Sequence, residues 1–327
     1  MKLNLLGATL AISVLTLASC SHDSVEAPTT PSTPPATSNN IYYVDSAKIY
    51  RVSLSGTDRM LIAGIDTTSP NSFIGSAVRS VDGSKIFFLH YTSGSSQSIK
   101  LYSVSSSGTN LQMLKTMQTG GNEYRLLNAT ADNKILFHQM QVTGGALSYS
   151  IQTIGSDGNG QAQVVPFPSG SPLLSRIAPN SRWAGIAFGG TATIKTGTAT
   201  SASLGTATDV GSPLSSGAYA MSSDGSKIAY AVQNGGSIDV KVYDIAGNST
   251  TTAFSHVIVS DIGTFTNYTT SVRWVNGTEK LLLSYGKFTS PSGSPSDFTQ
   301  VVLHTMSGGA DVAWRIHGDE VTNIIAE

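Results

Sequence analysis

Short apolar runs, each introduced by a tight-turn signal, recur along the chain from Ile41 onward. The clearest copy reads Ser-Val-Asp-Gly-Ser-Lys-Ile at residues 80–86 and leads into the apolar run 87–89. Residues 222–228 read Ser-Ser-Asp-Gly-Ser-Lys-Ile and lead into another such run. Short runs rich in β-branched and aromatic residues predict strands, and an Asp-Gly pair supplies the positive φ angles of a tight hairpin. No segment has a sustained 3.6-residue period, so the sequence predicts an all-β protein.

Two kinds of turn alternate along the chain. The first is Asp-Gly or a related pair, with successive spacings of 50, 48, 44 and 52 residues, and it occurs at 82–83, 132–133, 180–181, 224–225 and 276–277. The second is a glycine among small or polar residues, and its copies are Gly56, Gly108, Gly158, Gly205, Gly247 and Gly308. Each period therefore contains two hairpins and four strands. A four-stranded antiparallel unit repeated in this way predicts propeller blades.

The two ends of the chain are predicted to share the first blade. The chain has five turns of the first kind and six of the second. The turn at Gly56 is the one without a preceding turn of the first kind. Its unit begins at Ile41 and lacks a first strand. The apolar segment 320–326 follows the last complete unit, so it is predicted to supply that innermost strand. The expected fold is a six-bladed β-propeller of four-stranded antiparallel blades over residues 41–327, closed by the C-terminal strand.

The repeated pattern resembles the TolB-like β-propeller repeat. Ser-x-Asp-Gly-Ser-Lys-Ile is followed by a strand, then by Ile-Lys-Leu-Tyr-Ser-Val (99–104) or Val-Lys-Val-Tyr-Asp-Ile (240–245), and then by a Gly turn. The resemblance covers about residues 41–327 and implies the fold rather than a function. The unit at 180–210 departs from it, because Asn180-Ser181 replaces Asp-Gly. The Thr-, Ala- and Ser-rich residues 191–203 are expected to form an irregular loop, as are residues 290–296.

The first 40 residues have a different character. Residues 1–19 combine Lys2 with an apolar stretch too short to span a membrane comfortably, which predicts a signal peptide. Leu-Ala-Ser-Cys at 17–20 resembles the lipobox of bacterial lipoproteins, which implies a lipidated Cys20 and a membrane anchor. The alternative is an ordinary signal peptide with an incidental cysteine. Residues 20–40, rich in Pro, Ser and Thr, predict a disordered tether. By the sorting pattern of such lipoproteins in enteric bacteria, Ser21 favours the outer membrane, on its periplasmic side or at the cell surface of a Gram-negative cell.

Composition and missing motifs argue against several functions. Charged residues make up 12% of the chain and the formal net charge is −1, so no nucleic-acid partner is predicted. The chain has no Gly-x-Ser-x-Gly elbow and no His-Glu-x-x-His motif. His90 and His138 occupy similar places in their repeats and either approach each other at one rim or are solvated residues at strand ends. The loop at Asp157 lacks the bidentate Glu of a calcium loop and is expected to be a turn. No catalytic residue, metal or cofactor is predicted.

The candidate binding residues lie at the predicted ends of the inner strands. Arg79 and Arg273 share one repeat position, Arg176 lies one residue out of register, and Asn128 lies near the corresponding end of another unit. Together they are candidates to line the channel mouth and to take an anionic group such as a peptide carboxylate. The favoured alternative is that each Arg caps its own turn between the first two strands by pairing with Asp or Asn.

The sequence therefore favours a membrane-anchored, non-enzymatic binding or scaffold protein of the bacterial cell envelope. Its expected partner is a protein or peptide that contacts the propeller face or the channel mouth. The alternative is a propeller enzyme or a glycan-binding protein with its site in the central channel, which would require carboxylate, Asn and His side chains to converge at one rim.

Overall fold

Strands are the regular elements of this protein wherever its structure is described. The computed structural model describes residues 40–65, 71–93, 97–143, 146–167, 172–188, 191–200, 203–259, 264–265, 270–275, 278–288, 298–317 and 321–325. Within these ranges the chain forms strands β1 to β25, and no helix there is long and apolar enough to cross a membrane. The predicted signal peptide, Cys20, almost all of the tether and the loop 290–296 lie outside the described residues.

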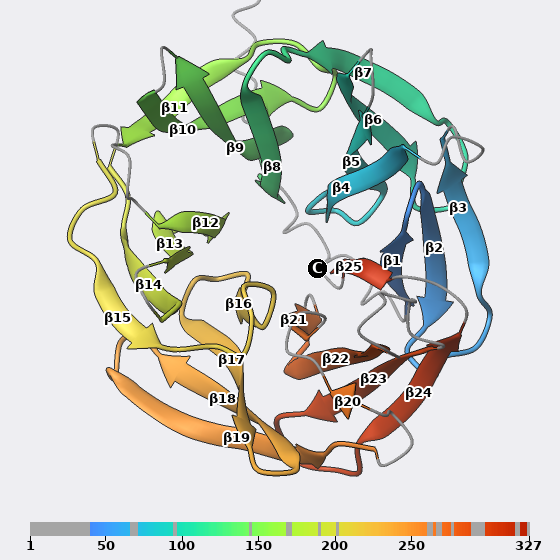
Figure 1. The fold of residues 1–327 in the computed structure, drawn as a ribbon, viewed down its shortest axis with the longest axis vertical. Coiled ribbons are helices and arrows are strands. Elements are labelled where there is room, and N and C mark those ends of the chain that lie inside the picture. The colour runs from blue at the N-terminus through green and yellow to red at the C-terminus, as the bar shows by residue number, and fades with distance from the viewer. Residues whose placement is uncertain are drawn as a thin grey trace, which may run out of the picture. The chain divides into compact units, whose positions relative to one another are not determined.

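The strands assemble into six antiparallel sheets around a central axis, as predicted (Figure 1). The inner strands are β25 (Val321–Ile325), β4 (Ser72–Arg79), β8 (Asn122–Ala129), β12 (Leu173–Ile177), β16 (Tyr219–Met221) and β21 (Ser271–Val275). The second strands are β1 (Asn40–Asp45), β5 (Lys85–Thr92), β9 (Lys134–Thr143), β13 (Arg182–Ala187), β17 (Lys227–Asn234) and β22 (Lys280–Phe288). In this order they define blades 1 to 6. Each inner strand contacts the inner strands of both neighbouring blades, so the sheets form a closed ring.

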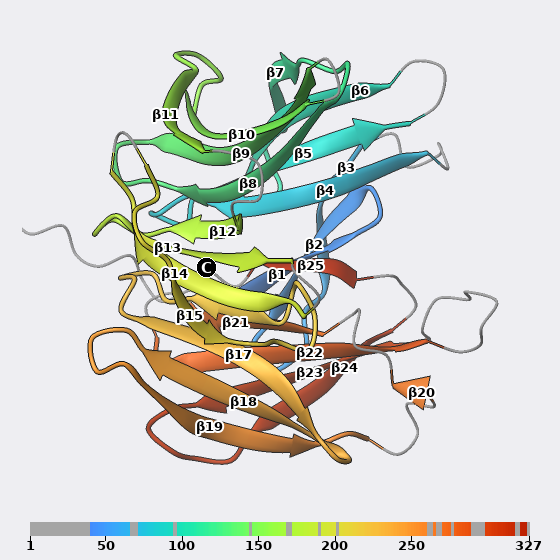
Figure 2. The same ribbon diagram turned by 60° about the vertical axis from the view of Figure 1, so that its left-hand side comes forward.

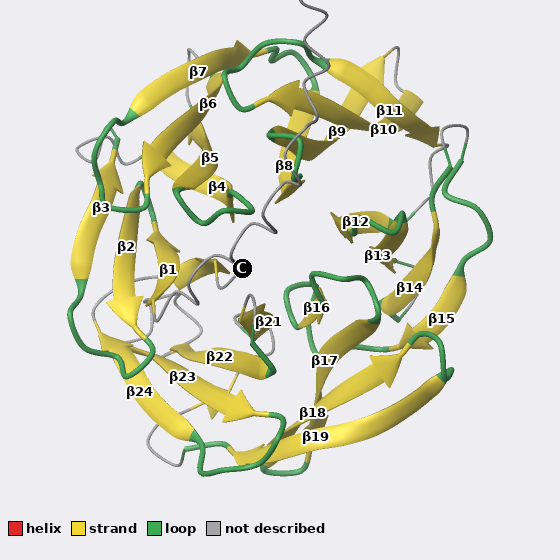
Figure 3. Cartoon of the chain, turned by 180° about the vertical axis from the view of Figure 1, so that it is seen from behind, coloured by secondary structure: helices red, strands yellow, loops and turns green. Residues whose placement is uncertain are grey.

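The remaining strands complete each blade outward from the axis. The third strands are β2 (Lys48–Ser53), β6 (Ser98–Ser105), β10 (Ala146–Gly155), β14 (Thr193–Thr198), β18 (Ser237–Asp244) and β23 (Phe298–Thr305). The outer strands are β3 (Met60–Gly64), β7 (Gln112–Met117), β11 (Ala162–Phe167), β15 (Thr208–Gly211), β19 (Ser249–Val257) and β24 (Val312–His317). A short extra strand, β20 (Thr264–Phe265), pairs with the C-terminal end of β22 (Figure 2). Seen from behind, the described ring consists of strands and their connecting loops (Figure 3).

Blade 1 contains both ends of the described chain, which confirms the predicted closure. β25 pairs antiparallel with β1, with Tyr43 opposite Ile324 and Asp45 opposite Val321. β1 continues into β2 and β3 through ordinary hairpins. The inner edge of β1 would be unpaired without β25, and unpaired edges are sites of non-native association.

The repeated Asp-Gly sequence builds the turn between the first two strands of a blade. Asp82 Oδ1 accepts hydrogen bonds from Ser80 Oγ (2.6 Å) and from the Ser84 amide (3.0 Å). These bonds, chiefly the one from Ser80, lower the pKa of Asp82 because they stabilise the carboxylate. Gly83 adopts φ +71°, which glycine reaches without strain. The same bonds recur at Asp224, so this motif is structural.

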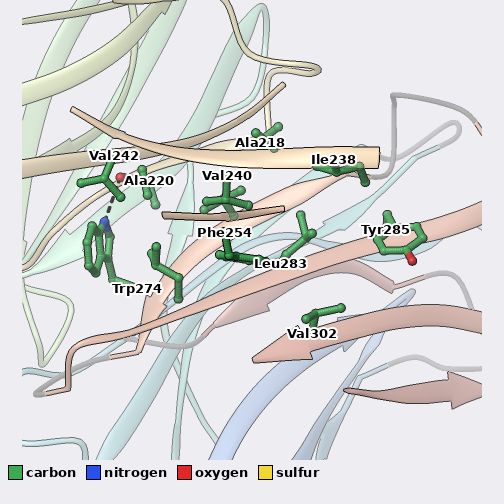
Figure 4. Close-up of a cluster of buried hydrophobic side chains, with 14 of the residues drawn as sticks. Ala218, Ala220, Ile238, Val240, Val242, Phe254, Trp274, Leu283, Tyr285 and Val302 are labelled. Carbon is green, nitrogen blue, oxygen red and sulfur yellow. Dashed lines mark hydrogen bonds between the residues drawn. The ribbon is translucent and has the colours of Figure 1, made fainter. Parts of the chain in front are cut away.

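The apolar core is divided among the six interfaces between blades. Six clusters of buried side chains are present in the described ring, and each combines residues from two adjacent blades. Figure 4 shows the cluster between blades 5 and 6, where Trp274 Nε1 donates a hydrogen bond to the Ala220 carbonyl oxygen across the interface (3.1 Å). A blade thus buries both of its faces only when both neighbours are in place.

Blade 4 departs from the sequence prediction. The expected irregular loop 191–203 contains the strand β14, so that expectation was wrong. Ile194 on β14 is fully buried, and Thr196 Oγ1 donates a hydrogen bond to the Trp183 carbonyl oxygen (2.7 Å). The Trp183 ring packs against Gly197, where an added side chain would meet it. The large ring on β13 therefore replaces the bulk that β14 lacks.

Candidate functional site

Three polar side chains from the inner strands of three different blades lie near enough to act on one another electrostatically. Arg125 lies on β8, Tyr219 on β16 and Arg273 on β21, all inner strands (Figure 1). The charge of Arg125 acts on both Tyr219 and Arg273, and the charge of Arg273 acts on Tyr219. β8 and β21 belong to blades 3 and 6, which stand on opposite sides of the ring (Figure 1). We call Arg125, Tyr219 and Arg273 the channel cluster.

Arg273 connects three blades. Its Nε donates a hydrogen bond to the Ile324 carbonyl oxygen of β25 (3.1 Å), and its Nη1 donates to the carbonyl oxygens of Gly217 (3.1 Å) and Val272 (2.8 Å). Burial, and then the nearby charge of Arg125, lowers the pKa of Arg273 to about 10. The group therefore stays protonated at neutral pH, and it binds the closing strand to blades 5 and 6.

Tyr219 packs in the apolar cluster between blades 4 and 5, and the charges of Arg125 and Arg273 both act on its buried hydroxyl. The residue is 2% exposed, and its oxygen makes no hydrogen bond of standard geometry within the described chain, although Ser175 of β12 approaches it. Burial raises the pKa of Tyr219, so the phenol is protonated at neutral pH and available as a donor. A buried polar atom without a partner is uncommon in native structures and calls for a structural or functional reason.

The channel cluster is suited to binding an anion. It combines two guanidinium groups with a phenolic donor, and no carboxylate is among the described charges that act on Arg273. The two like charges repel each other, and a bound anion would relieve that repulsion. No group of three or more His, Cys, Asp or Glu side chains capable of holding a metal ion occurs in the described part of the chain.

Two of the candidate binding residues, Arg79 and Asn128, form hydrogen bonds to backbone groups near the ends of the inner strands. Arg79 donates from Nε (3.2 Å) and Nη2 (3.1 Å) to the Gly83 carbonyl oxygen, so it bonds its own turn through the backbone and not through the Asp82 side chain. Asn128 accepts a hydrogen bond from the Ile177 amide of the next blade (3.3 Å) and donates to the Ala129 carbonyl oxygen (3.1 Å). Both side chains connect backbone segments.

Arg176 and Arg273 have different surroundings from these two. Burial lowers the pKa of Arg176 to about 10, while the charge of Asp224, in the turn of blade 5, opposes that effect. Arg176 thus sits toward the turn of its neighbour, whereas Arg273 belongs to the channel cluster. The structure brings Arg273 together with Arg125 and Tyr219, which the sequence analysis did not single out.

The two histidines noted in the sequence lie within strands and are buried, so they are not solvated strand ends. His90 Nε2 is 2.6 Å from Ser72 Oγ, and its ring meets Tyr102 edge-on. His138 packs against the Tyr149 ring, and burial, reinforced by the charge of Arg125, lowers the pKa of His138 to about 4. The loop at Asp157 is a turn as expected, with its carboxylate accepting the Asn159 amide (2.9 Å).

The six sheets and their order define a six-bladed propeller, and solved structures share this fold. A TolB protein from Acinetobacter baumannii superposes with a TM-score of 0.58 at 15% identity, covering 88% of this chain and 66% of that chain. This chain therefore spans slightly less than two thirds of that TolB chain. A chain of a nidogen/laminin complex gives 0.56 at 11% identity, covering 88% and 96% of the two chains. A putative 6-phosphogluconolactonase from Bacteroides fragilis gives 0.51 at 12% identity, covering 89% and 99%.

These similarities establish the fold and not the function. No protein-family model matches the sequence, and no curated protein sequence matches it significantly. The TolB-like six-bladed propeller implied by the repeat is confirmed by the structure and by its TolB neighbours. Because identities are at most 15% among these structures and one of them is a putative enzyme, function has to be argued from the site.

Proposed function

We propose that this protein is a membrane-anchored, non-enzymatic binding protein of the Gram-negative cell envelope, which holds a protein or peptide partner at the channel mouth. The observation that carries the proposal is the channel cluster, in which the charges of Arg125 and Arg273 act on each other and on the buried Tyr219 hydroxyl, a hydrogen-bond donor. Charge-assisted hydrogen bonds from guanidinium to carboxylate are among the strongest in proteins. The TolB-like fold, whose ring presents two open faces for docking, supports the same reading.

The recognised group on the partner is a carboxylate. A peptide C-terminus carries one at the end of a slender chain, which allows it to enter a channel lined by inner strands. A carboxylate would accept hydrogen bonds from Arg125 and Tyr219 and would screen the repulsion between Arg125 and Arg273.

This binding mode predicts a difference between free-acid and amidated peptides. In a panel of short peptides measured by isothermal titration calorimetry, those with a free C-terminal carboxylate should bind at least about tenfold more tightly than the same peptides with a C-terminal amide, because charge-assisted bonds are worth about 1.5–3 kcal/mol. Arg125→Met and Tyr219→Phe should each abolish most of that difference.

The matched control is Arg59→Met, which makes the same chemical change on the loop before β3, where Arg59 stacks over the Tyr50 ring. Equal binding of acid and amide peptides, or an equal loss in the Arg59 variant, would contradict the proposed site. Circular dichroism on every variant separates lost binding from lost folding.

The membrane anchor is proposed from the sequence, since Cys20 lies outside the described residues. Lipidation of Cys20 would tie the protein to the outer membrane through the Pro-, Ser- and Thr-rich tether, with the propeller in the periplasm or at the cell surface. Cys20→Ser should move the protein from the membrane fraction to the soluble fraction when the host cells are fractionated, whereas Ser21→Ala should leave it with the membrane. A Cys20 variant that still sediments with membranes would exclude this anchor.

A further inference from the structure

A cleft lies between blades 2 and 3, and no residue of the channel cluster lines it. Its volume is about 450 Å³, within the range of small-molecule sites in proteins. Lys115 and Met117 of β7 form one wall, and residues of β8 to β11 form the other. Figure 1 shows β7 beside the blade that these four strands make. Lys115 Nζ donates a hydrogen bond to Gln161 Oε1 across the gap (2.9 Å), so the two blades are tied at its rim.

Glutamine amides dominate the lining of this cleft. Five of its nine lining residues are glutamines, namely Gln118, Gln139, Gln152, Gln161 and Gln163. Gln152 is buried and Gln139 half-buried, whereas the other three are exposed. They come from three strands and two loop ends, so the set is assembled by the fold and not by a run of sequence. We call this site the amide cleft.

Two of these amides are held in fixed orientations at the base. Gln139 Nε2 donates to Asn122 Oδ1 (3.0 Å), and Gln152 Nε2 donates to Ser150 Oγ (2.9 Å). With each nitrogen engaged in this way, the two Oε1 atoms remain as acceptors, and neither accepts a hydrogen bond within the described chain. Gln139 and Gln152 therefore present two positioned acceptor oxygens to the cleft. The exposed glutamine amides at its rim can both donate and accept hydrogen bonds.

The lining selects for an uncharged ligand rich in hydroxyl groups. No carboxylate or guanidinium group lines the cleft, and its one ammonium group, on Lys115, is bonded to Gln161. An amide donates and accepts at once, which matches a hydroxyl group, because a hydroxyl also does both. The apolar lining is limited to Met117, Ala162 and the body of Tyr124, too little to bury several apolar side chains of a peptide.

We infer that the amide cleft is a binding site for a neutral carbohydrate chain. Gln139 and Gln152 accept hydrogen bonds from its hydroxyl groups at the base, and the exposed glutamines bind hydroxyl groups at the rim. Tyr124, whose ring packs against Phe137, supplies a rigid side wall. This site is separate from the channel cluster and does not depend on the proposed carboxylate binding.

The test is a titration of the folded propeller with neutral trisaccharides. Glucose, mannose, galactose and xylose trimers are added up to 10 mM, roughly the weakest affinity a small shallow site gives, while ¹⁵N side-chain amide resonances of glutamine are followed by NMR. At least one sugar should shift the Gln139 and Gln152 resonances in a saturable way. Gln139→Met and Gln152→Met, which keep the volume and remove the amide, should each weaken that binding at least about fivefold, the loss of roughly one net hydrogen bond.

Two controls make the result specific. Gln233→Met changes a glutamine at the end of β17, outside the cleft, and should leave sugar affinity unchanged. Arg59→Met, on the loop before β3 in blade 1, should also leave it unchanged. The inference is overturned if none of the four sugars shifts these resonances, if binding survives both cleft substitutions, or if an uncharged Gln- and Asn-rich peptide displaces the sugar at lower concentration.

Discussion

Deleting residues 321–327 should open the ring and lower the free energy of unfolding by more than about 5 kcal/mol. The deletion removes β25, the sole partner of the inner edge of β1 within the described chain. Ile324 is buried in the cluster between blades 6 and 1, and Ile325 in the cluster between blades 1 and 2. Truncating one buried Ile to Ala typically costs 2–5 kcal/mol, so losing both, with the strand pairing, exceeds any single core substitution.

Urea denaturation followed by circular dichroism measures this effect. A shorter truncation, which removes only residues 326–327, keeps β25 and should unfold at the same urea concentration as the full chain. The truncated ring should also associate, because the inner edge of β1 is left unpaired. Unchanged stability after deletion of 321–327 would contradict the closure by β25.

Trp183→Ala should have the second largest effect, a loss of about 4 kcal/mol in the free energy of unfolding. Trp183 is 1% exposed and lies in the cluster between blades 3 and 4. Its Nε1 donates a short hydrogen bond to the Leu204 carbonyl oxygen (2.6 Å), which holds the loop before β15. Neighbouring β14 offers small side chains, so little bulk is available to fill the resulting cavity.

Trp183→Phe separates the contribution of ring packing from that of the hydrogen bond to Leu204. It keeps most of the ring volume and loses the hydrogen bond, so it should cost roughly 1–3 kcal/mol, the cost of leaving the Leu204 carbonyl oxygen unsatisfied. Leu111→Ala provides the matched surface control, because that side chain is 45% exposed. If Trp183→Ala and Leu111→Ala have the same urea midpoint, the packing described for blade 4 is wrong.

The fold was predictable because its signals are local. Each Asp-Gly turn carries its own hydrogen bonds, as at Asp82, and so appears in the sequence as a short motif that can be counted. The strand β14 was missed because its buried residues are few and one of them, Thr196, is polar. This segment is stabilised as a strand by packing against Trp183 on the adjacent strand β13. The order of apolar and polar residues within 193–198 does not show that contact.

The channel cluster was only partly predictable, because equivalent repeat positions have different neighbours. Arg79 and Arg273 occupy the same place in their repeats, yet Arg79 bonds its own turn and Arg273 bonds β25 and Gly217. Arg125 lies four residues before the matching position, Ala129, in its own repeat. The charge of Arg125 acts on Arg273 only because folding places blades 3 and 6 in one ring. The spacing of repeats along the sequence does not encode that proximity.

Blade 1, which contains strands from both ends of the described chain, also affects how the protein folds during synthesis. Tyr43 and Ile324 are partners in the sheet but are 281 positions apart in sequence (324 minus 43). During synthesis from the N-terminus, β1 is complete long before β25 exists, and pairings this distant in sequence form slowly. The nascent chain therefore exposes one strand edge and two half-formed interfaces until β25 emerges. A chaperone that covers that edge until then would lower the risk of non-native association.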